Sequence, residues 1–281
     1  VMDYLVKVKK PGLLLCLDFE KAFDSINLEY MFKVMRAFGC GPDYCRWLET
    51  FYTNIKSTVL VNGKLGQWFP INRGCRQGDP VSPYIFVMCV EIMSIMIKQN
   101  KFIKGITVEN IETKILQYAD DTELLLEGDK QSFEESLSTI GYFGKCSGLH
   151  LNTGKTAAVW LGVRKNSSVK YMQHLNIEWN PDKFKVLGIW FTSDLKDIVD
   201  INYSEKFLEI KSMYRTWLKR LITPLGRVAV LKSLILSKIT HLWLLLPNPP
   251  DGLINHLQES VFYFVWNKKE IKLVGKQLEK V

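Results

Sequence analysis

The chain has 281 residues, 47% of them hydrophobic, which is an ordinary globular composition with enough apolar side chains for one large core or two smaller ones. Its six cysteines form no CxxC pair and its four histidines are scattered, which argues against a zinc cluster or a disulfide framework and favours a reducing compartment. The net charge is +8, and +7 of it lies from Tyr203 to the end, where 13 Lys and Arg accompany 6 Asp and Glu.

Two apolar stretches, residues 81–97 and 239–250, are candidates for membrane spans. Glu91 interrupts the first, and the second is too short to cross a bilayer. We therefore expect two buried helices in a soluble domain, with no membrane partner. No cleavable leader opens the chain, and its start at Val1 leads us to expect a fragment of a longer protein.

The first half of the chain alternates between strand and helix patterns. Residues 12–17 predict a buried strand that stops at Asp18, and Asn27 predicts the N-cap of a helix that ends near Phe38. Residues 57–74 indicate a hairpin with Asn62-Gly63 at its turn. A long apolar helix is expected to end near residue 99, with Pro80 and Pro83 in its first turn.

The second half continues this alternation and then changes. Residues 116–128, "LQYADDTELLLEG", predict two strands of one hairpin, followed by a helix over 131–146 and by strands over 157–161 and 184–191. Beyond about residue 200 the pattern is helical only. Because the positive charge also begins there, we expect a domain boundary within residues 194–203.

Asp120 and Asp121 place two like charges between the strands of the predicted hairpin. At about 4 Å apart they would repel by roughly 4 kcal/mol at an effective dielectric constant of 20. A hairpin turn is one interpretation, since Asp is a common turn residue. The other is a divalent cation, which needs a further acidic ligand. Asp18 supplies a third carboxylate if its strand pairs with the hairpin, and three such groups could hold two Mg²⁺ ions for phosphoryl transfer.

Basic residues recur at every fourth position near the C-terminus. Lys211, Arg215 and Lys219 share one face of a predicted helix, and the apolar side chains of another face are Met213, Trp217 and Leu221. The cationic face could follow a phosphate backbone or could simply be solvated.

Five segments together resemble the reverse transcriptases of non-long-terminal-repeat (LINE-type) retrotransposons. In that family's order they are "LDFEKAFDS" with the first metal ligand, "RGCRQGDPVSP" for template and nucleotide, "YADD" with the second metal ligands, "GLHLNTGKT" with a catalytic lysine, and "VLGIWF" for the primer-grip hairpin. The resemblance covers residues 17–191, and the basic helices that follow are similar to the family's thumb.

The resemblance implies an α+β fold, with a polymerase palm over residues 1–200, in which helices pack on an antiparallel sheet, and an all-α thumb over 201–281. It implies an RNA-directed DNA polymerase that uses two Mg²⁺ ions, an RNA template, a DNA primer and deoxynucleoside triphosphates. Only seventeen residues precede Asp18, so the fingers are expected to be largely missing and the fragment to polymerise poorly alone. An intracellular location, nuclear and cytoplasmic, is implied without a visible targeting signal.

The resemblance also assigns roles to single residues. Asp18 and Asp120 would be the principal metal ligands, with Asp121 beside them. Lys155 would act as general acid towards the pyrophosphate leaving group. Phe23 would lie under the sugar, where a ribose 2′-hydroxyl would clash.

The block at residues 73–83 would contact nucleotide and template. Gln77 would position them, while Gly74 and Gly78 would let the backbone come close. Arg73 and Arg76 would contact phosphates. Asp24, near the position of a ribose-contacting carboxylate in RNA-dependent RNA polymerases, is interpreted as structural.

Three alternative functions are weighed against this one. A catalytically inactive RNA-binding remnant would keep the basic helices and have a relic acidic site. A nucleotide cyclase would need neither the template block nor a basic thumb, and a viral RNA-dependent RNA polymerase is disfavoured by Phe23 and by Tyr-Ala before the paired aspartates.

Overall fold

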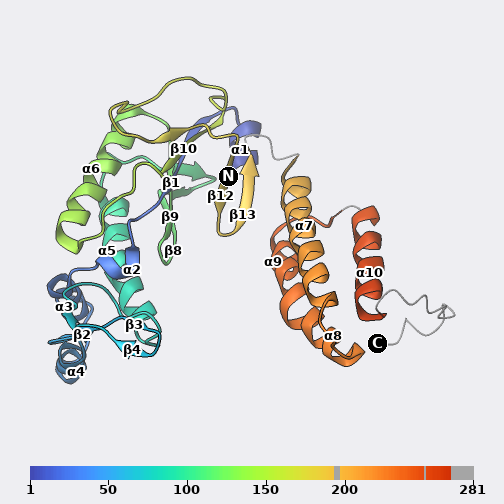
Figure 1. The fold of residues 1–281 in the computed structure, drawn as a ribbon. Coiled ribbons are helices and arrows are strands. Elements are labelled where there is room, and N and C mark those ends of the chain that lie inside the picture. Colours follow the sequence, from blue (N-terminus) through green and yellow to red (C-terminus); the bar gives the residue numbers. More distant parts are fainter. Residues whose placement is uncertain (193–196, 250, 267–281) are drawn as a thin grey trace. The chain divides into compact units, whose positions relative to one another are not determined.

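A computed structural model describes residues 1–192, 197–249 and 251–266, which fall into two compact units, Val1–Leu187 and Gly188–Val281. The division follows Leu187, earlier than the boundary expected within residues 194–203. The assignment of residues 1–200 to a palm and 201–281 to a thumb stays a prediction. Each unit is described by itself (Figure 1).

The first unit contains one main sheet, several short hairpins and six helices among its described residues. The sheet strands are β1 (Pro11–Leu17), β8 (Ile115–Tyr118), β9 (Asp121–Leu126), β10 (Ala157–Gly162) and β11 (Glu178–Trp179). The helices are α1 (Met2–Lys7), α2 (Ala22–Ser25), α3 (Leu28–Ala37), α4 (Pro42–Tyr52), α5 (Ser82–Gln99) and α6 (Lys130–Ser147). The short strands are β2 (Lys56–Ser57), β3 (Leu60–Val61), β4 (Lys64–Leu65), β5 (Phe69–Pro70), β6 (Ile106–Val108) and β7 (Ile111–Thr113).

The sheet has the strand order β11-β10-β1-β9-β8, so β1 lies at its centre. β1 pairs antiparallel with β9 and β10, and β9 pairs antiparallel with β8 in the hairpin that the sequence predicts. β1 reads as a continuous apolar run because both of its faces are buried. The run stops at Asp18, where the strand ends.

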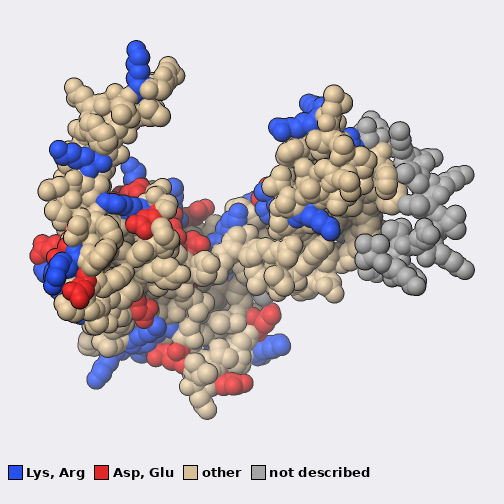
Figure 2. Space-filling model, turned by 90° about the horizontal axis from the view of Figure 1, so that it is seen from below, with Lys and Arg blue, Asp and Glu red and all other residues tan. Residues whose placement is uncertain are grey.

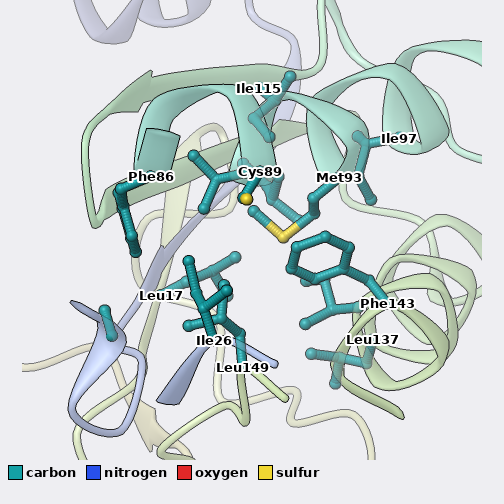
Figure 3. Close-up of a cluster of buried hydrophobic side chains, with 14 of the residues drawn as sticks. Leu17, Ile26, Phe86, Cys89, Met93, Ile97, Ile115, Leu137, Phe143 and Leu149 are labelled. Carbon is teal, nitrogen blue, oxygen red and sulfur yellow. The ribbon is translucent and has the colours of Figure 1, made fainter. Parts of the chain in front are cut away.

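Helices cover one face of this sheet and form the main core. Leu13, Leu15 and Leu17 of β1 join one hydrophobic cluster with side chains from α5 and α6. Figure 3 shows part of it, with Cys89 and Met93 of α5 close to Phe143 of α6. α5 is long and apolar enough to cross a membrane by length and composition. Its packing against α3, α6 and β8 accounts for that apolar surface and supports the interpretation as a buried core helix.

Capping and turn residues act largely as the sequence predicts. The Asn27 side chain accepts a hydrogen bond from Tyr30 N (3.1 Å) and caps α3. Asn62 and Gly63 join β3 to β4 with φ of 49° and 78°, the positive values that a two-residue hairpin turn needs. Pro83 lies in the first turn of α5, but Pro80 precedes the helix, so its predicted place was wrong.

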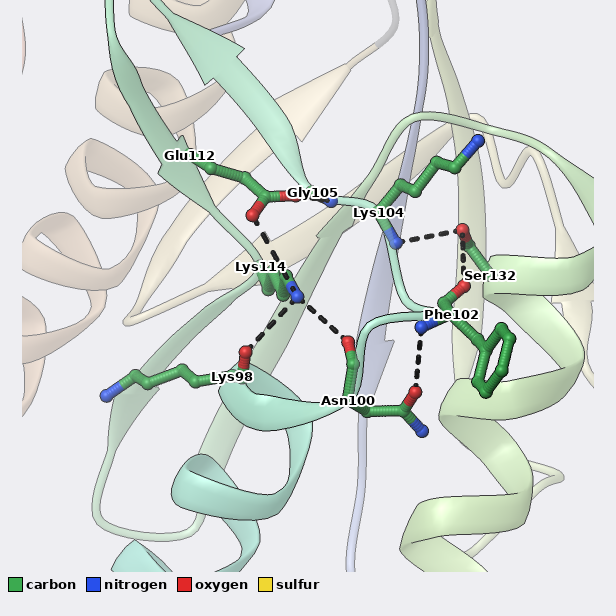
Figure 4. A network of polar contacts seen from close by, with 8 residues as sticks. All are labelled: Lys98, Asn100, Phe102, Lys104, Gly105, Glu112, Lys114 and Ser132. Atoms are coloured by element: carbon green, nitrogen blue, oxygen red, sulfur yellow. Dashed lines mark hydrogen bonds and ion pairs between the residues drawn. The ribbon is translucent and has the colours of Figure 1, made fainter.

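Several elements of the first unit have no counterpart in the sequence prediction. They include α1, α4, β11 and the β6–β7 hairpin, which is fixed to the C-terminal end of α5 (Figure 4). Lys114 Nζ donates to the carbonyl oxygens of Lys98 (3.2 Å) and Asn100 (2.9 Å). These contacts satisfy carbonyl groups that the helix end leaves unpaired.

The "VLGIWF" segment is not one strand over residues 184–191. It contains a turn at Leu187-Gly188, with φ of 47° and 84°, between β12 (Lys183–Val186) and β13 (Ile189–Thr192). The two strands pair as a separate two-stranded sheet. The single strand was therefore wrong, whereas the hairpin implied by the resemblance is present.

After β13 the described part of the second unit is helical, as expected beyond residue 200. It contains α7 (Ile198–Leu218), α8 (Pro224–Val230), a π-helical segment (Leu231–Ile235), α9 (Ser237–Leu245) and α10 (Asp251–Trp266). Its core includes Tyr203, Phe207, Ile210 and Tyr214 of α7. Leu221 lies beyond the end of α7 and is fully exposed, so its predicted place on the apolar face was wrong.

Candidate active site

Three aspartates lie at one end of the central strands. Leu17 pairs with Thr122, which brings the next residue, Asp18, alongside Asp121. Tyr118 pairs with Asp121, so the intervening Ala119 and Asp120 form a two-residue turn. Asp120 thus lies in the hairpin turn, whereas Asp121 begins β9. A turn at this position does not exclude a group of neighbouring carboxylates.

The three carboxylates interact electrostatically. The pKa of Asp121 is raised above its ordinary value, first by partial burial and then by the charges of Asp120 and Asp18. Oxygen donors with mutual repulsion are the ligand type that suits Mg²⁺. Within residues 1–192, 197–249 and 251–266, no three Asp, Glu, His or Cys side chains are already arranged as a metal site. The donor chemistry therefore fits a divalent cation, although side-chain rotation is needed to converge on one.

Glu123 is a buried acid that the sequence reasoning missed. Its side chain is 6% exposed, and burial followed by the charge of Asp121 raises its pKa to about 7. It pairs across the sheet with Cys16, whose pKa is raised to about 12 by burial and then by Glu123. A charged residue inside the apolar run "TELLLE" was the signal that could have revealed it.

The segment between Asp18 and Asn27 is held on one side by residues 147–152. Asn152 N donates to Asp18 O (2.8 Å), and Asn27 N donates to Ser147 O (2.7 Å). Gly148 has φ of +83°, and a Cβ there would lie 2.5 Å from Ser25 O. This block therefore needs glycine in order to approach the segment after Asp18.

Lys155 is placed by the same block. Its backbone N donates to Asn152 O (3.1 Å), and Asn152 is bonded to Asp18. Its side chain is exposed. The predicted general acid thus belongs to a short turn that is attached directly to a predicted metal ligand.

The same segment is held on its other side by residues 73–78. Gly74 N donates to Ile26 O (2.8 Å), and Cys75 N donates to Phe23 O (2.7 Å). Gln77 Nε2 donates to Asp24 Oδ1 (3.0 Å), which agrees with a structural role for Asp24.

Both glycines of this loop have a left-handed backbone. Gly74 has φ of +88°, and a Cβ there would lie 2.8 Å from Asp24 Cα and O. Gly78 has φ of +87° with no atom within 4 Å of a Cβ. Gly74 therefore permits a close approach of two backbones, whereas Gly78 leaves open space beside the loop.

The remaining residues predicted to contact nucleotide or template have protein partners. Phe23 is half-buried and stacks on Phe86 of α5, with ring centroids 4.1 Å apart. The Arg76 guanidinium donates to Phe51 O and lies 5.4 Å from the centre of the Tyr52 ring. Arg73 is exposed and forms an isolated β-bridge with Asn27.

The predicted nucleic-acid-binding cations of the second unit share one helix. Lys211 and Arg215 are exposed on α7, and Lys219 is its C-cap residue. Figure 2 shows Lys and Arg atoms at the surface of the helical second unit. The three side chains line one groove together with residues of α10.

A mainly antiparallel sheet with helices on one face and a pair of aspartates at the turn of its β8–β9 hairpin is the architecture of a polymerase palm. The family model for reverse transcriptase (RNA-dependent DNA polymerase) matches residues 2–191. The chain belongs to this family, which confirms the resemblance found in the sequence.

Individual relatives are distant but cover most of the chain. A transposon TX1 protein of 149 kDa from Xenopus laevis is 24% identical over 279 residues, 95% of this chain and 20% of the relative. The Pol polyprotein of the R2DM retrotransposable element from Drosophila melanogaster is 24% identical over 258 residues, 89% of this chain and 24% of the relative. The chain therefore spans about a fifth to a quarter of the length of these relatives.

A solved structure supports the fold. Telomerase from Candida tropicalis, in complex with a fragment of telomeric RNA, superposes with a TM-score of 0.50 at 12% identity. The match covers 95% of this chain and 42% of the telomerase chain. The predicted α+β fold is confirmed.

Proposed function

We propose that this chain is the polymerase part of a retrotransposon reverse transcriptase, which adds deoxynucleotides to a DNA primer 3′ end on an RNA template. The observation that carries the proposal is the placement of Asp18, Asp120 and Asp121 at one end of the β1–β9–β8 sheet, within a family of RNA-directed DNA polymerases. Deoxynucleoside triphosphates are the proposed substrates.

Asp18 and Asp120, with Asp121 beside them, would hold two Mg²⁺ ions. Such ions, when bound, activate the attacking hydroxyl and stabilise charge on the leaving oxygen. The raised pKa of Asp121 supports this assignment, because three interacting carboxylates favour a bound cation.

The protein's own groups do the remaining work. The Lys155 ammonium donates a proton to the leaving pyrophosphate, a step typically worth about 10²- to 10⁴-fold in rate. Its attachment through Asn152 to the Asp18 backbone supports this role. Phe23 is stacked on Phe86, and this contact supports its proposed role under the sugar, where a ribose 2′-hydroxyl would clash with the ring.

The loop of residues 73–78 positions the nucleotide and template. The hydrogen bond from Gln77 to Asp24 holds Gln77 beside the segment that carries Phe23. The open space at Gly78 leaves room for a ligand against the backbone. Arg76 would contact a phosphate only after leaving the carbonyl of Phe51, whereas Arg73 is already exposed.

Incorporation of labelled dTTP on poly(rA)/oligo(dT) with Mg²⁺ tests the proposal. The chain, its Asp120→Ala variant and a version extended upstream are compared, because the chain spans only about a fifth to a quarter of the length of its relatives. Activity in the chain or the extended version that disappears with Asp120→Ala supports the polymerase. Silence in all of them, with RNA binding unchanged by Asp120→Ala, supports the inactive RNA-binding remnant instead.

A further inference from the structure

One buried hydroxyl contacts both ends of the loop that carries Gln77 and Gly78. Tyr52 is the last residue of α4 and is only 3% exposed. Its hydroxyl accepts a hydrogen bond from Arg76 N (3.3 Å) and shares another with Ser82 Oγ (3.3 Å), in which either oxygen can donate. Arg76 directly precedes Gln77, and Ser82 is the first residue of α5. The stretch of residues 76–82 therefore begins and ends at the same oxygen atom.

The support beneath this hydroxyl is well packed. Cys45 and Leu48, two turns and one turn before Tyr52 on α4, are buried in the same core. Arg36 of α3 forms an ion pair with Glu49 of α4, which joins the two helices on their exposed side. A side chain in a close-packed core has little freedom to move. The Tyr52 hydroxyl is therefore a fixed point against which the loop is placed.

The other hydrogen bonds of residues 76–82 divide into local turns and one distant contact. Asp79 N donates to Arg76 O (3.4 Å), and Ser82 N donates to Asp79 O (3.2 Å). The distant contact is the bond from Gln77 to Asp24. The local turns give the loop its shape, whereas Asp24 and the Tyr52 hydroxyl fix its place from two sides.

The contact between the two hydroxyls is shielded from water, because Ser82 is 1% exposed. Removal of one partner from a buried hydrogen bond leaves the other partner unsatisfied, which costs more than the loss of the same bond at the surface. The loop should therefore respond measurably to the loss of this single oxygen atom.

We propose that Tyr52 is a positioning residue for the nucleotide: its hydroxyl closes residues 76–82 into the form in which Gln77 and the backbone at Gly78 meet the incoming deoxynucleotide. The inference rests on the proposed function, which assigns nucleotide binding to this loop. Because Tyr52 is buried and acts through the loop, it affects how tightly the nucleotide binds and leaves the chemical step unchanged.

The kinetic test uses Tyr52→Phe, which removes the hydroxyl and keeps the ring beside the Arg76 guanidinium. In whichever form of the chain polymerises, this variant should raise the KM for dTTP by roughly 3- to 10-fold, the effect of one hydrogen bond of ordinary strength, with kcat unchanged. Tyr30→Phe is the matched control. It removes another hydroxyl that packs on the same core and donates to Cys89 O (2.8 Å) on α5, outside the loop, and should leave both parameters unchanged.

A double substitution tests whether the hydroxyl joins the two ends of the loop. Ser82→Ala removes one of its two partners. If both partners act through the Tyr52 hydroxyl, the variant with Tyr52→Phe and Ser82→Ala together should have the same KM as Tyr52→Phe alone, because contacts that share one group are not additive. Additive effects on KM would overturn the proposal.

Hydrogen exchange followed by mass spectrometry tests the closure without catalysis. Peptides that cover residues 76–82 should exchange roughly 3- to 10-fold faster in Tyr52→Phe than in Tyr30→Phe or the unchanged chain, because the loop opens more often. Faster exchange in a chain that incorporates no dTTP would support closure of the loop by Tyr52 and count against the polymerase. Equal exchange in all three proteins, or equal KM values in the two tyrosine variants, would overturn the proposal even where incorporation of dTTP supports the polymerase.

Discussion

Replacing Gly74 by alanine should damage the first unit more than the same change at Gly78, four residues further along one loop. The two glycines have almost identical backbones, with φ of +88° and +87°. The left-handed conformation costs any L side chain about 1–2 kcal/mol. This cost is therefore common to both variants, and Gly78→Ala measures it alone.

At Gly74 a second cost is added. The new Cβ would lie 2.8 Å from Asp24 Cα and O, and these are backbone atoms that cannot rotate away. Forcing extra volume into such a contact typically costs about 1–3 kcal/mol. We expect Gly78→Ala to lower the free energy of unfolding by about 1–2 kcal/mol and Gly74→Ala by about 2–5 kcal/mol.

Urea unfolding followed by tryptophan fluorescence compares the free energies, with equal m-values as the condition for a direct comparison. Because Gly74 N and Cys75 N bond to the segment that holds Phe23, Gly74→Ala should also raise the KM for dTTP in whichever form of the chain polymerises. Equal losses of stability in the two variants would show that the backbone contact with Asp24 contributes nothing, and would refute the reasoning.

Three further substitutions test neighbouring contacts. Asp24→Ala removes the acceptor of the Gln77 side chain and should weaken discrimination between dTTP and UTP in steady-state kinetics. Asp24→Asn keeps an acceptor oxygen and should retain that discrimination. Burial, followed by the charge of Asp121, raises the pKa of Glu123 from 4.5 to about 7, so the folded state holds the proton more tightly than the unfolded state and the free energy of unfolding falls as pH rises between these values. With a chelator present, Glu123→Gln should raise the free energy of unfolding in urea by up to about 3 kcal/mol at pH 8 and should leave it unchanged at pH 4. Lys155→Ala should lower single-turnover dTTP incorporation by about 10²-fold or more with unchanged primer binding, and normal turnover would exclude it as the general acid.

The sequence was sufficient where a feature depends on local patterning. The apolar run before Asp18 and the two apolar segments that flank Asp120 and Asp121 predicted the strand and the hairpin that bring the acids together, because an apolar strand needs partners and a hairpin supplies one. α4 could also have been found, since Pro42 at its first position and Asp43 in its first turn are helix-start signals.

Other features were beyond local patterning. The turn at Leu187-Gly188 places a leucine at positive φ, which sequence preference argues against, so residues 184–191 read as one strand. The partners of Arg76 and Gln77 are separated from them by 25 and 53 positions, and only the folded chain brings them together. Nothing in the sequence around Arg76 predicts that its guanidinium donates to the carbonyl oxygen of Phe51 at the end of α4.

The segment from Asp18 to Asn27 connects two blocks that lie far apart in the sequence. Backbone hydrogen bonds attach it to the lysine block through Asn152 and to the nucleotide block through Gly74. Each attachment needs a glycine, Gly148 or Gly74, because a Cβ would meet the segment's own backbone. The proposed metal ligand Asp18, the proposed proton donor Lys155 and the proposed sugar-facing ring of Phe23 are thereby held near one another by one ten-residue stretch. Apart from these two glycines, the backbone contacts do not depend on side-chain identity, so the spacing of the site should tolerate substitutions beside them.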